Sequence, residues 1–505
     1  MIDLDWIAKW AQLKPEQTAI TDLETGEKFT YKTLNQISND IAFHLQEQIK
    51  EGDRVAVLME QSPFLVMLFS ACQRLGAILV PLNYKLSTSE IGQQLKDSQP
   101  SIFIYSEVFE EQVTLLKDSF ETVKLIDFKD AVKKNSTKNK ENRTSTINHD
   151  LPVFLFYTTG TTAKPKGVLY TNKMLFWNSL NTSMQLGITS EDCTINILPP
   201  YHTSGWNIFL TPLLHNGGHI TILKKFNPDK ILHHLEAEKV TLFIALPTIL
   251  QMISKSENFE KTDLSKLKYI ISGGESISQE QVALWKNKKN TNVRPGYGLT
   301  EAGPSITSLH QDFVFSKANS IGKPNFYVDL KIIDFKGNEA AENEVGELCI
   351  KGDIVTPGYW NNSVATKDKI KNGWFHTGDL AYRDADGFFF LKGRIDDMYI
   401  TGGENIFPQE IESVLKQHPD IQSALVLPFD DDVWGKKGVA FVKTNSEHLL
   451  IKDIQNFMKD KLAKFKQPKE YIFMKDFPIT GFGKISRKDL IRMYNDIQNK
   501  KEQLK

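Results

Sequence analysis

Short apolar runs alternate with amphipathic or polar segments through the first part of the chain. Residues 55–59, 77–82, 101–105 and 123–126 are short and apolar, which predicts buried strands. Residues 64–75 are mostly apolar and follow Pro63, and proline favours the first turn of a helix. Strands that alternate with helices predict βαβ units and a largely parallel sheet.

The pattern changes near residue 395. Beyond it, residues 423–427, 438–442 and 471–474 are expected to form strands, and one apolar helix face is expected from the spacing of Leu450, Ile454, Phe457, Met458 and Leu462. We therefore predict a large domain at residues 1–395 and a smaller one at 396–505. Residues 133–146 contain no apolar side chain, which predicts a surface loop.

Composition places the chain among ordinary globular proteins. Its 505 residues exceed what one core usually supports, so at least two domains are expected. The formal net charge of −1 gives no long-range field for nucleic acid or an anionic membrane. No signal peptide and no apolar run near the ~20 residues of a membrane span is visible, so we expect a cytoplasmic protein without a transmembrane segment. The sequence leaves a homodimer open.

The three cysteines carry no recognisable chemistry. Cys72, Cys193 and Cys349 lie far apart and in no CxxC or Cys/His motif that would indicate a zinc site or a disulfide framework.

A loop rich in small and hydroxyl residues follows the apolar residues 151–157. Its sequence is TTGTTAKPKG, residues 158–167. Small residues after a buried strand let backbone N–H groups converge on an oxyanion, and a lysine adds a point charge suited to phosphate. The loop does not fit the Walker A pattern. Candidate phosphate-binding residues are Thr158, Thr159, Gly160, Thr161, Thr162 and Lys166.

This loop resembles the phosphate loop of the adenylate-forming superfamily, which includes acyl- and aryl-CoA synthetases, peptide-synthetase adenylation domains and firefly luciferase. Two positions depart from the family pattern. Thr159 stands where the family usually has Ser, and Ala163 stands where it usually has Gly.

Further motifs follow in the family's order, and the resemblance assigns them roles. In SGGE, Gly273, Gly274 and Glu275 would line the adenine pocket. In GYGLTEAG, residues 296–303, Tyr297 would stack on adenine beside Gly298, Thr300 would bond a phosphate oxygen, and Glu301 would hold Mg²⁺. Asp379 would accept the ribose hydroxyls, with Arg394 as a second ribose contact.

The resemblance also assigns roles near the C-terminus. Asp396 would be a hinge between the two domains. Gly402, Gly403 and Glu404 would meet the thiol, although Glu404 could instead cap a helix that begins near Gln409. Lys484 would bridge the substrate carboxylate and the α-phosphate, which makes Lys484, Lys166, Thr300 and Glu301 the expected catalytic set.

The fold implied by the resemblance is α/β. A large N-terminal domain would hold αβ-layered, mostly parallel sheets and a β-barrel-like subdomain. A small, mobile α+β domain would follow it.

The acid is the least constrained part of the expected reaction. By resemblance, residues 199–207 border the acyl site, with His202 and Trp206 as wall residues; the alternative is that both pack in the core. Leu299 and residues 302–304 suggest an apolar wall, and no Asp is placed to pair with an amino acid's α-amine. A fatty or aryl acid is favoured.

The expected activity is that of an AMP-forming acid–CoA ligase. It would use ATP and Mg²⁺ to make an acyl-adenylate and would pass the acyl group to CoA. Three alternatives stay open: a stand-alone enzyme that loads a carrier protein, a luciferase-type oxygenase, and an inactive nucleotide-binding protein, the last motivated by Ala163.

Overall fold

The chain divides into two compact units. The computed structural model describes residues 4–116, 124–127, 147–158, 165–401, 404–431, 433–444, 446, 448–459, 461–479 and 485–503. Unit 1 comprises Met1–Leu330, Ile350–His376 and Gly387–Phe389, and unit 2 comprises Lys331–Cys349, Thr377–Asp386 and Phe390–Lys505. The predicted loop at residues 133–146 lies outside the described residues.

The first sheet of unit 1 has six strands in the order β6-β5-β3-β4-β7-β8. The pairings from β6 to β7 are parallel, and β8 runs antiparallel to β7. The sequence-based strands at 55–59, 77–82, 101–105 and 123–126 overlap four of these strands, which confirms the βαβ prediction. The strands are β3 (Arg54–Leu58), β4 (Ile78–Pro81), β5 (Ile102–Tyr105), β6 (Lys124–Asp127), β7 (Pro152–Thr158) and β8 (Lys166–Thr171).

The helices that connect these strands begin and end where their sequences predict. Helix α3 (Pro63–Leu75) starts at its proline and ends at Gly76, which adopts a φ of 67° that favours glycine. Helix α4 (Thr88–Ser98) begins with a capping box in which Ser87 and Glu90 bond each other's backbone N–H. Helix α5 (Glu110–Leu116) follows a short 3-10 turn.

The second sheet of unit 1 runs in the order β15-β14-β13-β12-β11-β9-β10-β1-β2. Neighbours from β13 to β1 are parallel, and β2, β14 and β15 pair antiparallel with their neighbours. The strands are β1 (Thr18–Asp22), β2 (Lys28–Thr30), β9 (Cys193–Asn196), β10 (His219–Ile222), β11 (Leu242–Ile244), β12 (Tyr269–Ser272), β13 (Val293–Tyr297), β14 (Thr307–Ser308) and β15 (Ser320–Pro324).

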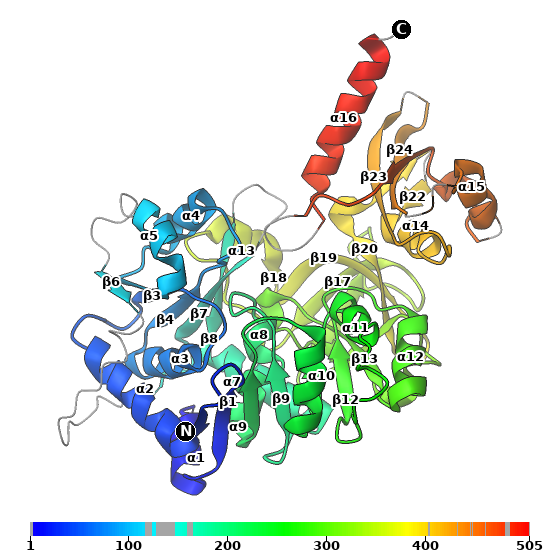
Figure 1. Ribbon diagram of the computed structural model, residues 1–505. Coiled ribbons are helices and arrows are strands. Elements are labelled where there is room, and N and C mark those ends of the chain that lie inside the picture. The colour runs from blue at the N-terminus through cyan, green and yellow to red at the C-terminus, as the bar shows by residue number, and fades with distance from the viewer. Residues whose placement is uncertain are drawn as a thin grey trace. The chain divides into compact units, whose positions relative to one another are not determined.

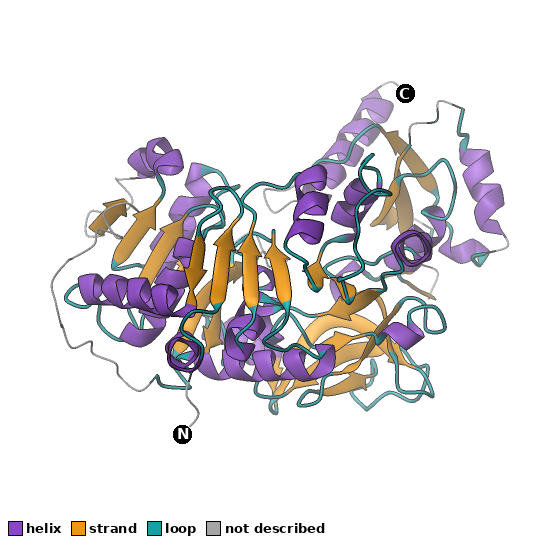
Figure 2. Ribbon diagram, turned by 60° about the horizontal axis from the view of Figure 1, so that its bottom comes forward, coloured by secondary structure: helices purple, strands orange, loops and turns teal. Residues whose placement is uncertain are grey.

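Helices pack against both sheets of unit 1, whose neighbouring strands largely point the same way (Figures 1 and 2). Among the described helices, none is both long enough and apolar enough to span a bilayer. The remaining elements of unit 1 are α1 (Trp6–Leu13), α2 (Tyr31–Leu45), α7 (Asn172–Leu186), α8 (Ser204–Asn207), α9 (Leu210–Asn216), α10 (Pro228–Ala237), α11 (Pro247–Ser254), α12 (Gln279–Lys289), α13 (Ser363–Lys369), β18 (Ile370–Lys371) and two 3-10 turns at Thr300–Ala302 and Gln311–Phe313.

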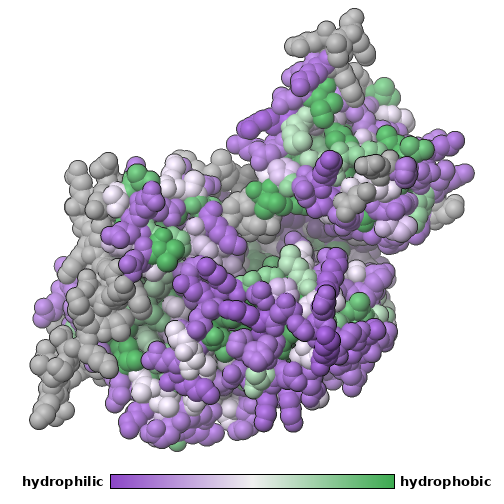
Figure 3. All heavy atoms as spheres, viewed as in Figure 1, coloured by the Kyte–Doolittle hydropathy of each residue, from purple (hydrophilic) through white to green (hydrophobic). Residues whose placement is uncertain are grey.

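One large apolar core joins the elements of unit 1. At its centre Phe69 of α3 stacks on Phe154 of β7 with ring centroids 5.1 Å apart, and Trp206 of α8 lies 4.9 Å from Phe154. Aromatic pairs at these separations stabilise a core beyond their buried area. The face shown in Figure 3 is mostly hydrophilic, with separate hydrophobic patches.

The described part of unit 2 holds two groups of strands and the helices α14, α15 and α16. Strands β16 (Asp329–Ile333), β17 (Gly346–Lys351), β19 (Trp374–Arg383) and β20 (Phe389–Arg394) lie side by side in that order. A mixed sheet follows in the order β22-β21-β24-β23, with β25 parallel to β24. The other elements are β21 (Tyr399–Thr401), β22 (Glu404–Ile406), β23 (Ser423–Asp431), β24 (Gly435–Lys443), β25 (Glu470–Met474), α14 (Pro408–Leu415), α15 (Ile451–Lys459), α16 (Arg487–Gln503) and 3-10 turns at Ile395–Asp397 and Lys464–Lys466.

The predicted helix near residue 454 is shorter than its spacing suggested. Helix α15 holds Ile454, Phe457 and Met458, but Leu450 precedes it with 63% of its surface exposed. Leu462 follows the helix and is buried in the same core cluster. The periodicity therefore identified the helix but extended it too far at both ends. The α/β class with mixed sheets and a small C-terminal domain is confirmed, while the boundary at residue 396 stays a prediction.

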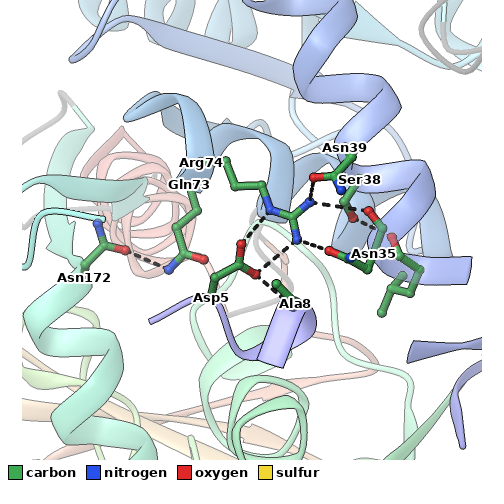
Figure 4. A network of polar contacts seen from close by, with 9 residues as sticks. Asp5, Ala8, Asn35, Ser38, Asn39, Gln73, Arg74 and Asn172 are labelled. Carbon is green, nitrogen blue, oxygen red and sulfur yellow. Dashed lines mark hydrogen bonds and ion pairs between the residues drawn. The ribbon is translucent and has the colours of Figure 1, made fainter. Parts of the chain in front are cut away.

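A buried arginine ties the first two helices of unit 1 to α3. Arg74 exposes only 4% of its side chain and pairs with Asp5, with Nε 2.7 Å from Oδ2 (Figure 4). Its Nη2 also donates to Oδ1 of Asn35 at 2.6 Å, and its Nη1 donates to Oδ1 of Asn39. Asp5 in turn caps α1 by accepting the N–H of Ala8. The N-terminal helix is therefore fixed through one guanidinium.

We predict that Arg74→Met lowers the free energy of unfolding by roughly 3–5 kcal/mol, because it removes one partner of a largely buried ion pair. Urea denaturation measures the change. Lys288→Met is the matched control, since Lys288 and Glu260 form a pair that is exposed on both sides and contributes little. An equal, small loss in both variants would contradict this role for Arg74.

Candidate active site

The loop predicted to bind phosphate closes the β7–β8 hairpin. Thr158 is the last residue of β7 and stands opposite Lys166, the first residue of β8. The hydroxyl of Thr158 donates to the carbonyl of Lys166 at 3.5 Å. The intervening candidates, Thr159, Gly160, Thr161 and Thr162, lie outside the described residues, as does Ala163. The structure thus places both ends of the loop.

A distant segment pairs with the outer edge of β8. The N–H of Leu169 donates to the carbonyl of Gly358 at 3.1 Å, and the N–H of Trp360 donates to the carbonyl of Gly167 at 2.8 Å. The hydroxyl of Thr356 donates to the carbonyl of Leu169 at 2.6 Å. Residues 356–360, which we call the clasp, are thereby held against β8, the strand that begins at Lys166.

The clasp connects Lys166 with Glu301. The hydroxyl of Tyr359 donates to Oε1 of Glu301 at 2.9 Å, and Nζ of Lys166 lies 5.5 Å from the centroid of the Tyr359 ring. The N–H of Thr356 also donates to the carbonyl of Glu301 at 2.8 Å. Lys166 and Glu301, which belong to distant motifs, therefore both contact the side chain of Tyr359. This arrangement can place opposite charges around a phosphate chain and a metal ion.

The GYGLTEAG motif folds back on itself after β13. A Cβ built on Gly298 would lie 2.1 Å from the carbonyl oxygen of Pro304, so only glycine fits there. The close approach turns the chain sharply, and the 3-10 turn that follows presents Thr300 and Glu301. Tyr297, the last residue of β13, is partly buried and packs against a small apolar cluster.

The SGGE segment lies at the carboxyl end of β12, next to β13. Gly273 sits so close to the carbonyl of Gly296 that a Cβ would lie 3.1 Å from that oxygen, and Gly274 adopts a φ of 81°. Glu275 follows them and is exposed. Because ligands bind at the carboxyl ends of parallel strands, this is where a nucleotide base is expected.

A cavity of about 190 Å³ opens between these two motifs and α8. Gly273, Gly274, Gly298 and Thr300 belong to its wall, and His202 enters it from the segment before α8. Most of the remaining wall is apolar, and no lysine, arginine or carboxylate is among the described residues that line it. The apolar side chains are Leu186, Leu198, Ile208, Ile244, Leu246, Ile271, Leu299 and Pro304.

Trp206 does not form the cavity wall that the sequence predicted. It is fully buried, packs at a tilt against the rings of Phe69 and Phe154, and donates its indole N–H to the carbonyl of Pro200 at 2.7 Å. The core alternative therefore holds for Trp206, because α8 turns its indole toward α3 and β7. His202 is half-buried and lies at the cavity.

The two predicted ribose contacts meet in unit 2. Oδ1 of Asp379 lies 3.3 Å from Nη1 of Arg394, whose Nη2 donates to the carbonyl of Thr377 at 3.1 Å. The N–H of Asp379 donates to the hydroxyl of Thr377 at 2.9 Å. The carboxylate is largely buried while the guanidinium is half-exposed, so the pair can offer a fixed acceptor and a donor to a diol.

The remaining predicted residues lie in unit 2 or outside the described residues. Asp396 is exposed in the 3-10 turn after β20. Glu404 begins β22 and is exposed; it does not cap α14, whose N-cap is Phe407, because the strand ends only at Ile406. Gly402, Gly403 and Lys484 lie outside the described residues.

Sequence reasoning missed Tyr359. Nothing in its immediate sequence ties it to residue 166 or to residue 301, because the link runs through strand pairing. The only local signal is the glycine before it, Gly358, whose φ of 147° marks an unusual backbone.

Comparison with known proteins agrees with this geometry. The AMP-binding enzyme family model matches residues 7–360, and the AMP-binding enzyme C-terminal domain model matches residues 410–484. Feruloyl-CoA synthase from Amycolatopsis sp. is 30% identical over 97% of this chain and 98% of its own. Indoleacetate–CoA ligase from Aromatoleum aromaticum is 31% identical over 97% of both chains.

Solved structures give the same result. The O-succinylbenzoate coenzyme A synthetase from Bacillus subtilis in complex with ATP and magnesium is 30% identical, with a TM-score of 0.87 over 96% of this chain and 98% of its own. ATP-bound MatB from Rhodopseudomonas palustris is 27% identical, with a TM-score of 0.90 over 98% of this chain and 100% of its own. Acid–CoA ligases of this kind use ATP with Mg²⁺, and CoA as co-substrate. This chain belongs to the AMP-binding enzyme family, in the acid–CoA ligase branch of the adenylate-forming superfamily.

Proposed function

We propose that the chain is an aryl acid–CoA ligase, which joins an aromatic carboxylic acid to CoA through an acyl-adenylate. The observation that carries this choice is the cavity of about 190 Å³ with its mainly apolar wall. An apolar cavity of roughly 150 Å³ holds one benzene ring. The space therefore suits an acid with one aromatic ring better than a long alkyl chain.

The charge of the cavity wall supports the same choice. A second carboxylate on the acid would be paired best by a cation in the wall, because a buried unpaired charge is costly. The described wall has no lysine or arginine, although it has several hydroxyl groups. Relatives that act, by name, on ferulate, indoleacetate and 2-succinylbenzoate support an aryl acid.

In the first half-reaction the acid's carboxylate attacks the α-phosphorus of ATP and pyrophosphate leaves. Both reactants are anions, so the protein must offset their repulsion. We assign Lys166 to the departing phosphates and Thr300 to a phosphate oxygen. Asp379 and Arg394 hold the ribose, and Lys484 approaches the reacting carboxylate.

Glu301 fits the role of Mg²⁺ ligand. Its carboxylate is a hard oxygen donor, and the Tyr359 hydroxyl fixes its orientation. When bound, Mg²⁺ would neutralise charge on the phosphate oxygens. Tyr359 thus orients the carboxylate while its ring faces the ammonium of Lys166.

In the second half-reaction the thiol of CoA loses its proton and attacks the acyl carbon of the acyl-adenylate. The bond from that carbon to the phosphate oxygen breaks, and AMP leaves. We propose that the predicted small domain, residues 396–505, turns about Asp396, which withdraws Lys484 and brings forward Gly402, Gly403 and Glu404. One cavity would then serve both half-reactions. Cytoplasmic location belongs to the proposal and is supported by the buried thiols of Cys72 and Cys193.

The proposal is tested by incubating the protein with ATP, Mg²⁺, CoA and a panel of aryl, fatty and dicarboxylic acids, with products identified by mass spectrometry. We expect an aryl-CoA thioester as the main product. Exclusive formation of fatty acyl-CoA would contradict the aryl assignment. Pyrophosphate release without any acyl-CoA would instead indicate a carrier protein as acceptor.

Tyr359→Phe should raise the Mg²⁺ concentration for half-maximal pyrophosphate release about 10-fold, because partners that orient a metal ligand typically contribute 10–100-fold to affinity. A coupled pyrophosphate assay measures this. Tyr170→Phe is the control, since the hydroxyl of Tyr170 on β8 is buried and makes no hydrogen bond with any described residue. Equal Mg²⁺ dependence in the two variants would remove Tyr359 from the site.

Asp396→Pro should leave adenylate formation close to normal and reduce thioester formation at least about 10-fold, because proline fixes φ at the proposed hinge. Single-turnover assays of each half-reaction measure the two effects separately. Asp396→Ala keeps the backbone free and is the matched comparison. Equal loss in both half-reactions would count against a hinge at this residue.

A further inference from the structure

A buried arginine lies behind the cavity, and the roles assigned so far do not use it. Arg294 of β13 exposes 3% of its surface. Its guanidinium lies 4.7 Å from the centroid of the Tyr269 ring, and its Nε donates to the carbonyl of Leu309 at 3.1 Å. Burial lowers the pKa of this guanidinium from its ordinary value, although arginine stays charged in proteins.

Within the described chain, no carboxylate forms an ion pair with Arg294. Asp312 acts on it only at longer range, and that carboxylate is exposed and pairs with the ring of His310 at 3.3 Å. A buried cation without a carboxylate is costly, so its donors must serve other acceptors. One of them is Ser308, whose Oγ accepts from Nη2 of Arg294 at 3.4 Å.

Ser308 connects the guanidinium of Arg294 to the cavity. The residue is 4% exposed and belongs to the cavity wall. Because its oxygen accepts from Arg294, its own O–H is left to donate, and no acceptor for that proton exists among the described residues. The neighbouring Thr307 differs, since its hydroxyl donates to the carbonyl of Ile321 at 2.6 Å.

Ser308 and Thr300 line the same cavity from different elements. Ser308 pairs with Gly296 of β13, and Thr300 begins the 3-10 turn that follows β13. An acid bound in this cavity therefore has both hydroxyl groups in its wall. Arg294 and Gly296 lie on the same face of β13, because side chains alternate along a strand.

We propose that Ser308, oriented by Arg294, is a specificity-determining residue that selects aryl acids with an oxygen substituent on the ring. The serine O–H would donate to a ring hydroxyl or ether oxygen, and the guanidinium behind it would strengthen that bond. Arg294 does not itself belong to the wall, which favours a neutral oxygen over a free carboxylate. This inference rests on the proposed aryl acid–CoA ligase activity.

The test compares matched aryl acids in the full-length protein. 3-Phenylpropenoic acid and its ring-hydroxy, ring-methoxy and ring-methyl derivatives, each at positions 3 and 4, serve as substrates, and kcat/KM is measured by acyl-CoA formation. The methyl group is close to the hydroxyl in size but accepts no hydrogen bond. We expect the best oxygenated acid to exceed its methyl counterpart about 10-fold, the usual effect of one hydrogen bond.

Four variants test which residues cause the preference for oxygenated acids. Ser308→Ala should reduce the hydroxy-to-methyl ratio to about 1, chiefly by lowering kcat/KM for the oxygenated acid, and Ser308→Thr should restore it because threonine keeps the hydroxyl. Thr307→Val is the matched control, since it removes a cavity hydroxyl whose proton is already donated elsewhere, and it should keep the ratio. Arg294→Met should lower the ratio with Ser308 intact.

The outcomes separate the inference from the function beneath it. If wild type converts hydroxy and methyl acids equally, or if Ser308→Ala keeps the wild-type ratio, the role of Ser308 is wrong while the aryl ligase activity stands. If none of the aryl acids is converted, the unsubstituted acid included, the proposed function fails and the inference fails with it.

Discussion

The candidate site depends on the pairing of the clasp with β8. Three hydrogen bonds hold residues 356–360 against that strand, and another ties Thr356 to the backbone of Glu301. This pairing helps to keep Lys166, the second lysine of the phosphate loop, near Glu301 of the GYGLTEAG motif. Tyr359 adds side-chain contacts to this backbone pairing, because its ring faces Lys166 and its hydroxyl donates to Glu301. Secondary-structure pairing thus sets the electrostatics of the site.

Steric limits act together with this pairing. Gly298 leaves no room for a side chain beside Pro304, and Gly273 approaches the backbone of Gly296 closely. These contacts shape the loop that separates the polar end of the site from the apolar cavity. At the polar end, Lys166 and Glu301 both contact Tyr359. At the other end, the wall is mainly apolar, and the buried cation Arg294 donates to Ser308 of that wall. A site of this form favours a substrate that is anionic at one end and mostly apolar at the other.

The sequence indicated several elements well because their local chemistry is strong. Continuous apolar runs gave β3, β4 and β5, and Pro63 marked the start of α3. Asp379 and Arg394, which their motifs assign to the same ligand, pair with each other, and their role toward a ribose stays a prediction. Trp206 was different. Its position in the sequence suited a wall residue, but the angle of a four-residue helix turns it into the core between α3 and β7. The direction of a side chain on so short a helix depends on its neighbours in space, which the sequence does not give.

By itself, the sequence determined the order of strands and helices, the family motifs and the class of reaction, because each depends on residues that are close together along the chain. Only the tertiary structure decided which of those residues meet. Tyr359 reaches Lys166 and Glu301 through pairing between segments that lie almost two hundred residues apart. Arg294 is connected to the cavity wall because it donates to Ser308 on the neighbouring strand. The size of the cavity and the charge of its wall likewise depend on many residues that are far apart in the sequence. Local interactions repeat at fixed sequence spacings and can be recognised, whereas long-range contacts depend on how whole elements pack.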